Sequence, residues 1–329
     1  MNNSSIEICF ILWIIALGLC IGSFLNVVIL RGLSGESIVL PPSKCTKCGN
    51  KLKWWMNIPL LSYIFLKGKC YYCKENISIQ YPVVEFITAI FFLLIFLKFG
   101  FTVQTVFYFI AFSILTVMSV CDIKESVIFD IHAYILIAAG LILNILTDGL
   151  NGFLFAILGA VLGFLIYEII ARTGILFAGM RAFGEGDSLI ASGIGAYFGW
   201  KLMLISIALS VITMAIFTFP YFFLKSRKEG KKKTCFALIL SLFLIISAFC
   251  ISKTEIIKTF EVSLAFVIFM MILAFLCAKL ILDDIKNNNN EKDENSFCML
   301  PFGPAMAISF IIIMFYSNEL TALVKSYFG

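Results

Sequence analysis

The chain has 329 residues, of which 61% are hydrophobic and 14% are charged, and its formal net charge at pH 7 is +5. Soluble domains are about half apolar and about a quarter charged, so this composition excludes a soluble globular domain. The apolar residues also occur in long runs, which indicates an all-α polytopic membrane protein. The first run lacks a basic leading segment and a clear cleavage site, so we interpret it as a retained helix.

The apolar runs predict about ten transmembrane helices, most of them close to the ~20 residues needed to span a bilayer. The eighth and ninth runs in chain order form a pair between the basic segment 225–233 and the polar segment 284–299. The runs lie at about 8–30, 83–98, 102–121, 131–147, 151–171, 188–200, 202–224, 234–252, 260–283 and 301–317.

These runs and the loops between them predict six regions. They are a first transmembrane helix, a small cytoplasmic loop domain, a membrane core, the extra pair, a cytoplasmic loop, and a closing helix with the C-terminus. In the same order, their bounds are 1–30, 31–82, 83–232, 233–283, 284–299 and 300–329.

The distribution of Lys and Arg predicts the orientation in the membrane. The N-terminal "MNNSSIE" has none, loop 31–82 has eight, and 225–233 has six. Positive loops stay in the cytoplasm, so we expect the N-terminus outside and both of these loops inside. In this topology Asp122, Asp130 and Asp187 all fall at cytoplasmic helix ends.

Four of the eleven cysteines form two knuckles in loop 31–82, Cys45-x-x-Cys48 and Cys70-x-x-Cys73. This paired spacing predicts a tetrahedral Cys₄ zinc site. Disulfides or free thiols are the alternatives, and a reducing cytoplasm disfavours disulfides. Four protein ligands leave no open position for water, so we expect the zinc to be structural.

Two aspartates are the candidate catalytic residues. Asp122 ends the third predicted span, and Asp187 begins the sixth in Gly184-Glu185-Gly186-Asp187. Two carboxylates brought close together share a proton, so one can act as base on a water and the other as acid toward a carbonyl oxygen. The glycines allow a tight bend and a close approach. The pattern therefore predicts an aspartic protease.

Plainer roles remain open for several charged residues. Asp187 could simply cap its helix, and Asp130 could cap the fourth helix or support the site. Glu185 is a solvated or supporting charge. His132 is interpreted as structural. Glu85, at the start of the second span, is either an interfacial residue that reaches the membrane surface or a site for a second reaction.

Five segments together resemble the bacterial type IV prepilin peptidases, the prepilin leader peptidase/N-methyltransferase family of GxGD aspartic peptidases. They are "GSFLNVVILR" at 22–31, the double-knuckle segment at 45–86, "CDIKESVIFD" at 121–130, "GEGD" at 184–187 and "PFGPAMA" at 301–307. The resemblance covers about residues 8–224 and 300–316.

The resemblance implies a role for several residues. Asp122 and Asp187 would be the catalytic pair, with Asp130 and Glu185 close by. The family cleaves the basic leader of type IV prepilins and pseudopilins after a Gly, on the cytoplasmic side of the bacterial inner membrane. Its full-length members then methylate the new N-terminal residue, usually Phe, with S-adenosylmethionine. Loop 31–82 would be the possible methyltransferase region, but we place no methyl-transfer residue. The expected partners are prepilins and the lipid bilayer, and no nucleic acid.

The chain also departs from the family. The family often has Lys two residues after the second aspartate, where this chain has Leu189. Segment 233–283 is longer than the family leads us to expect, so the resemblance implies a core of eight transmembrane helices with this segment as an extra pair.

Three other functions would share some of these features. A protease of the presenilin or signal-peptide-peptidase kind would have Tyr rather than Cys121 before its first aspartate, and its Pro-Ala-Leu matches poorly at Pro304-Ala305-Met306. A transporter would want carboxylates near mid-membrane and has no need of a Cys₄ loop. A zinc-knuckle scaffold would bind partners only.

Overall fold

The computed structural model describes residues 3–40, 42–178, 181, 184–228 and 301–328. The chain divides into two compact units, and each is taken by itself. The first comprises Met1–Val211 and Leu300–Gly329, and the second comprises Ile212–Met299. The predicted extra pair at 233–283 and the loop at 284–299 lie outside the described residues.

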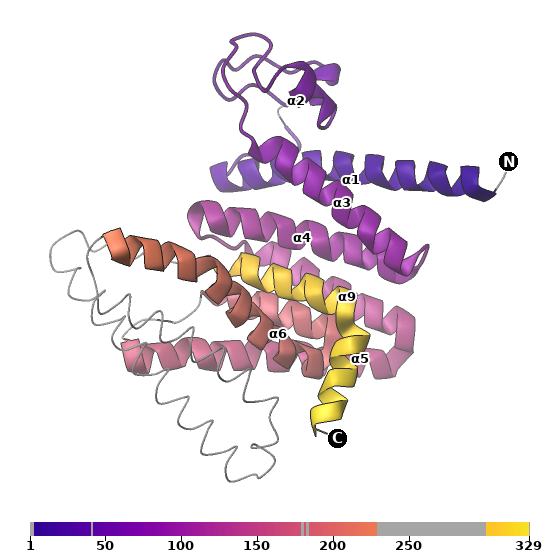
Figure 1. The fold of residues 1–329 in the computed structure, drawn as a ribbon, viewed down its shortest axis with the longest axis vertical. Coiled ribbons are helices and arrows are strands. Elements are labelled where there is room, and N and C mark those ends of the chain that lie inside the picture. The colour runs from indigo at the N-terminus through magenta and orange to yellow at the C-terminus, as the bar shows by residue number, and fades with distance from the viewer. Residues whose placement is uncertain (1–2, 41, 179–180, 182–183, 229–300, 329) are drawn as a thin grey trace. The chain divides into compact units, whose positions relative to one another are not determined.

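Long helices make up most of the described chain (Figure 1). Their bounds are α1 Asn3–Ser34, η1 Trp54–Asn57, α2 Leu61–Phe65, α3 Gln80–Phe99, α4 Val103–Glu125, α5 Asp130–Ala178, α6 Glu185–Lys228 and α9 Gly303–Phe328. Among these described helices, six are long and apolar enough to cross a membrane. The prediction of an all-helical polytopic membrane protein is therefore confirmed, whereas the count of ten spans is not.

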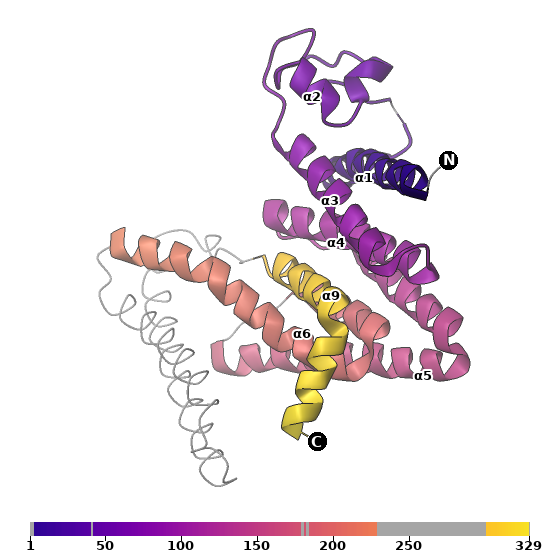
Figure 2. The ribbon, with the colours of Figure 1, turned by 45° about the vertical axis from the view of Figure 1, so that its right-hand side comes forward.

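Two glycines account for part of the difference in the count. Helix α5 contains Gly149 in a left-handed conformation (φ 61°), where two predicted spans adjoin. Helix α6 contains Gly199 at φ 73° at a similar boundary. A residue with positive φ breaks the helical path, and only glycine adopts it without strain. Figure 2 shows the chain turning back within α5.

Helices α1, α3 and α4 pack against one another, and small residues allow the close approach of α1 to α3 (Figure 1). A Cβ added at Gly18 would lie 2.6 Å from the Cα of Ala89, and one added at Gly22 would lie 2.7 Å from the Cα of Glu85. Such contacts replace the hydrophobic driving force that helices lack inside a bilayer.

The first half of α6 lies against both halves of α5. A Cβ added at Gly140 in α5 would lie 2.9 Å from Ala196, and one added at Gly159 would meet the carbonyl oxygen of Gly195. Residues 190–199 are consequently all buried. The start of α6, which carries the Gly-Glu-Gly-Asp segment, is thus held by a tightly packed helix.

Candidate active site and metal centre

Asp122 lies in the last turn of α4 and is only 6% exposed. The helix ends just beyond it at Ser126, whose left-handed backbone (φ 52°) turns its N–H to the Asp122 carbonyl. The side-chain Oδ2 accepts a hydrogen bond of 2.8 Å from the backbone N–H of Gly303, the first residue of α9. Asp122 therefore joins the end of one helix to the start of another.

Asp187 lies in the first turn of α6 and is 5% exposed. Its Oδ2 accepts a hydrogen bond of 3.0 Å from the backbone N–H of Gly184, just before the helix. This is the return bond of a capping box, so one oxygen caps α6. The other oxygen, Oδ1, is buried and has no hydrogen-bond partner within the described part of the chain. Helix capping therefore accounts for Oδ2 of Asp187 but not for Oδ1.

The two aspartates lie close enough for the charge of Asp122 to act on Asp187. Both carboxylates also accept a backbone N–H at a helix N-terminus, that of α9 for Asp122 and that of α6 for Asp187. The positive end of a helix dipole favours a negative charge at such a position. The fold therefore brings together two buried carboxylates that are 65 positions apart in the chain.

The residues predicted to support the pair differ in their surroundings. A Cβ added at Gly186 would lie 2.6 Å from the Cβ of Ile128, so this close approach requires glycine. The Glu185 side chain is 84% exposed and pairs with Arg181 at 2.8 Å. Asp130 is exposed and makes no side-chain hydrogen bond or ion pair to any described residue, so its supporting role stays a prediction.

A group of ion pairs that the sequence reasoning missed joins α5 to the start of α6. Glu168 of α5 binds Arg181 at 2.7 Å and Arg172 at 2.7 Å. Ser188, next to Asp187, donates to the same Glu168 carboxylate at 3.4 Å. A lone Glu inside the apolar run 151–171 was the available sequence signal, since such charges need partners.

Glu85 joins the loop domain to the membrane helices. It is 6% exposed, and its Oε2 accepts a 2.8 Å hydrogen bond from the backbone N–H of Leu60. Leu60 adopts a positive φ of 58°, a conformation that a leucine rarely adopts. Nearby, Asn26 of α1 donates to the Tyr81 carbonyl and accepts from Gln80. Glu85 is therefore a buried residue of the α1–α3 junction rather than one exposed at the interface.

The four knuckle cysteines converge. Their sulfur atoms all lie within 4.8 Å of one another, and those of Cys45 and Cys73 are 3.9 Å apart. Tetrahedral zinc with Zn–S bonds of about 2.3 Å places its sulfurs about 3.8 Å apart. All four cysteines are free of disulfides. The arrangement therefore fits zinc.

The two knuckles share one backbone design. The N–H of Cys45 binds the carbonyl of Asn50, and the N–H of Gly49 binds the carbonyl of Cys45. In the second knuckle, Cys70 and Lys74 make the equivalent bonds. Gly49 (φ 71°) and Lys74 (φ 59°) thus hold the same left-handed position.

Backbone amides favour the thiolate form that a metal needs. The N–H groups of Cys73 and Tyr72 lower the pKa of the Cys70 thiol to about 7. The backbone of Asn50 likewise lowers the pKa of Cys48. A thiolate is the form of cysteine that binds metal. Despite its backbone hydrogen bond with Glu75, the pKa of Cys73 is raised to about 11 by burial and the neighbouring thiols, so this cysteine would lose its proton only as the metal binds.

Comparisons with known proteins agree with this architecture. The model of the bacterial peptidase A24 N-terminal domain matches residues 16–99, and the model of the type IV leader peptidase family matches residues 109–219. The chain therefore belongs to the type IV leader peptidase family.

Relatives from several bacteria carry the name prepilin leader peptidase/N-methyltransferase. That of Myxococcus xanthus is 35% identical over 195 residues, which is 59% of this chain and 58% of the relative. That of Pseudomonas aeruginosa is 34% identical over 252 residues, which is 69% of this chain and 86% of the relative. The chain thus spans less than two thirds of the first relative and most of the second. No solved structure matches the chain significantly.

Proposed function

We propose that this chain is a membrane aspartic endopeptidase that cleaves the leader of type IV prepilins or pseudopilins after a Gly, and then N-methylates the new N-terminal residue. The observation that carries the peptidase is the pair of buried carboxylates, Asp122 in the last turn of α4 and Asp187 in the first turn of α6, with the charge of Asp122 acting on Asp187. Membership of the family and the names of the relatives support the substrate class and the second reaction.

The surroundings of the carboxylate oxygens support different tasks for the Oδ2 atoms and for Oδ1 of Asp187. The Oδ2 atoms of Asp122 and Asp187 are anchored by backbone N–H groups. The unpartnered Oδ1 of Asp187 is then free to accept a proton from water. The hydroxide so formed attacks the carbonyl carbon, and the second carboxyl donates its proton to the carbonyl oxygen. Breaking the C–N bond returns one proton to the leaving amine.

The position of the pair suits a prepilin. Asp122 lies at the end of one candidate span and Asp187 at the start of another, so both lie near a membrane boundary. A prepilin is a membrane helix with a basic leader, and its scissile bond lies at that same boundary. The enzyme can therefore reach the bond without unwinding the substrate in mid-bilayer.

The charge pattern supports a bacterial inner-membrane protein with its N-terminus outside and its active site facing the cytoplasm. Loop 31–82 carries eight basic residues, whereas the first seven residues carry none. The zinc at Cys45, Cys48, Cys70 and Cys73 would lie in the reducing compartment, where thiolates persist.

The zinc would have a structural task. Zinc bound to four thiolates has no open position and supplies folding energy to a loop with little core of its own. The cavity of the loop domain does not fit S-adenosylmethionine, because three lysines line it and would repel the sulfonium cation. We therefore assign no residue to the methyl donor.

Mass spectrometry of one substrate tests both reactions. Membranes that contain the chain would be incubated with a prepilin-like substrate that has a basic leader and a Gly-Phe junction. We expect a product that begins at Phe, and S-adenosylmethionine should add the mass of one methyl group. Cleavage without the added mass would leave the peptidase intact and refute the methyltransferase. No cleavage of several such substrates would refute the peptidase.

A further inference from the structure

Helix α2 of the loop domain presents an exposed apolar face. Leu61, Ile64 and Phe65 lie at positions i, i+3 and i+4, so they share one side of the helix. They are 50%, 65% and 76% exposed. A group of large apolar side chains on one exposed face marks an interaction surface.

A hydrogen bond holds this face at the level of the membrane helices. Leu60, the residue before α2, donates its N–H to Glu85 at 2.8 Å. Glu85 belongs to the candidate span Gln80–Phe99. At ~1.5 Å of rise per residue, it lies about 7.5 Å along α3 from Gln80. Helix α2 therefore begins beside the first turns of a membrane-spanning helix.

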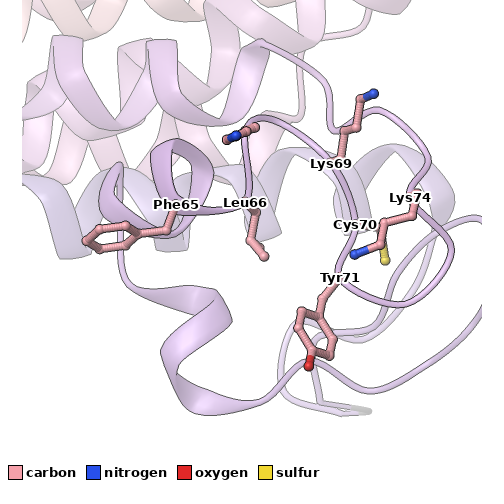
Figure 3. A pocket seen from close by; sticks show the side chains of 7 residues that line it. Phe65, Leu66, Lys69, Cys70, Tyr71 and Lys74 are labelled. Carbon is pink, nitrogen blue, oxygen red and sulfur yellow. The ribbon is translucent and has the colours of Figure 1, made fainter.

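A basic cavity of about 380 Å³ adjoins the apolar face. Lys67, Lys69 and Lys74 line it, and no acidic residue does. None of the three lysines forms an ion pair with a described residue. Figure 3 shows Phe65 on one side of the cavity, with Lys69 and Lys74 on the other. The Nζ of Lys74 also lies 5.3 Å from the centre of the Tyr71 ring.

We propose that this cavity binds the headgroup of an anionic phospholipid of the surrounding bilayer, with the apolar face of α2 in the headgroup–acyl boundary. Lysines beside a membrane attract anionic lipids, and an adjacent apolar face adds burial that a soluble phosphate could not use. Loop 31–82 has eight basic and two acidic residues, so a basic prepilin leader would be repelled from it. The bound lipid would hold the zinc-knuckle domain against the leaflet.

The backbone of the knuckles suggests variants that remove the lysines without disturbing the fold. Lys74→Gly introduces the residue that the first knuckle has at the equivalent position, Gly49, where the backbone also has positive φ. Lys67 also has positive φ (50°), which Asn tolerates, so Lys67→Asn and Lys69→Gln complete a triple variant. The matched control removes the same charge from the first knuckle region: it combines Lys47→Gln with Lys51→Gln and Lys53→Gln, three residues that do not line the cavity.

Native mass spectrometry of the purified full chain, with added phosphatidylglycerol or phosphatidylcholine, tests the proposal. We expect the wild type to retain phosphatidylglycerol in preference to phosphatidylcholine. The cavity variant should lose that preference by about tenfold or more, while the control keeps most of it. Both variants should retain zinc, which shows that the loop domain is folded.

Three results would overturn the proposal. An equal loss in both variants would mean general attraction by a basic loop. An unchanged preference in the cavity variant would place the lipid elsewhere. Displacement of the lipid by soluble glycerol phosphate would assign the cavity to a free phosphate compound instead.

Discussion

Asp122 accepts a 2.8 Å hydrogen bond from the backbone N–H of Gly303, a residue 181 positions later in the chain. This bond joins the last turn of α4 to the first turn of α9. Asp187 repeats the arrangement with Gly184 at 3.0 Å. Each candidate catalytic carboxylate is therefore oriented by a backbone N–H at a helix N-terminus. For Asp122, the close approach of that backbone also depends on Gly303 having no side chain.

The contact of Gly303 with Asp122 predicts the effect of Gly303→Ala. The added Cβ would lie 2.9 Å from Oδ2, so the carboxylate must move. A shift of about 1 Å in a catalytic group can cost about 10²-fold, and we expect the cleavage rate to fall by at least about tenfold. Gly32→Ala is the control, since its Cβ would meet only the edge of Phe129 at 3.3 Å. Equal rates in the two variants would contradict the account.

The contact of Gly186 with Ile128 predicts a rescue. Gly186→Ala would place a Cβ 2.6 Å from the Cβ of Ile128, displacing the start of α6 and lowering the cleavage rate. Ile128→Gly removes every side-chain atom in that contact. We therefore expect the double variant to cleave faster than Gly186→Ala alone. If the second change gives no recovery, the requirement for glycine at 186 has another cause.

The two arginines that bind Glu168 should differ in their effect on stability. The Arg181 side chain is 29% exposed and also binds Glu185, whereas that of Arg172 is 72% exposed. Exposed ion pairs contribute little to stability, and an ion pair contributes more as its partners are withdrawn from water. Arg181→Gln should therefore lower the temperature of thermal unfolding more than Arg172→Gln. A larger decrease for Arg172→Gln would show that the ion pair between Glu168 and Arg181 does not stabilise the contact between α5 and the start of α6.

Zinc retention should depend on pH. The pKa of the Cys70 thiol is lowered to about 7 and that of Cys73 is raised to about 11, so the free site keeps a proton on Cys73 at neutral pH and gains another on Cys70 as the pH falls below about 7. Protons compete with zinc for thiolate sulfur, so the apparent zinc affinity should fall as pH decreases below about 7. Metal analysis after dialysis against a chelator at several pH values measures this.

The matched variants of that experiment are Cys45→Ser and Cys20→Ser. The first removes a proposed ligand and should abolish zinc retention, while the second changes an exposed cysteine of α1 and should leave it intact. Zinc bound equally by both variants would mean that the ion lies elsewhere.

Local patterns predicted much of this architecture. The apolar runs predicted the spanning helices, because burial in lipid requires about 20 apolar residues whatever the fold. The CxxC spacing predicted the cysteine cluster, because each knuckle is a local turn. The gap between the predicted spans 131–147 and 151–171 coincides with Gly149, whose left-handed backbone breaks the helical path of α5.

The sequence could not predict the contacts between residues far apart in the chain. Nothing local links Gly303 to Asp122 or Leu60 to Glu85, since both bonds form only when distant segments pack. The alternative prediction that Asp187 caps its helix describes one of its two oxygens, since Oδ2 does cap α6. Only packing showed that the second oxygen is buried without a partner among the described residues.

The most direct test of the paired aspartates is the rate of prepilin-like substrate cleavage in membranes that contain wild type, Asp187→Asn or Asp148→Asn. Asn keeps an oxygen that can accept the Gly184 N–H but cannot exchange a proton, so Asp187→Asn should accumulate normally and cleave about 10²–10⁴-fold more slowly. Asp148 is exposed in α5, and its variant should cleave like the wild type. Cleavage by a normally accumulating Asp187→Asn at the wild-type rate would contradict the central claim.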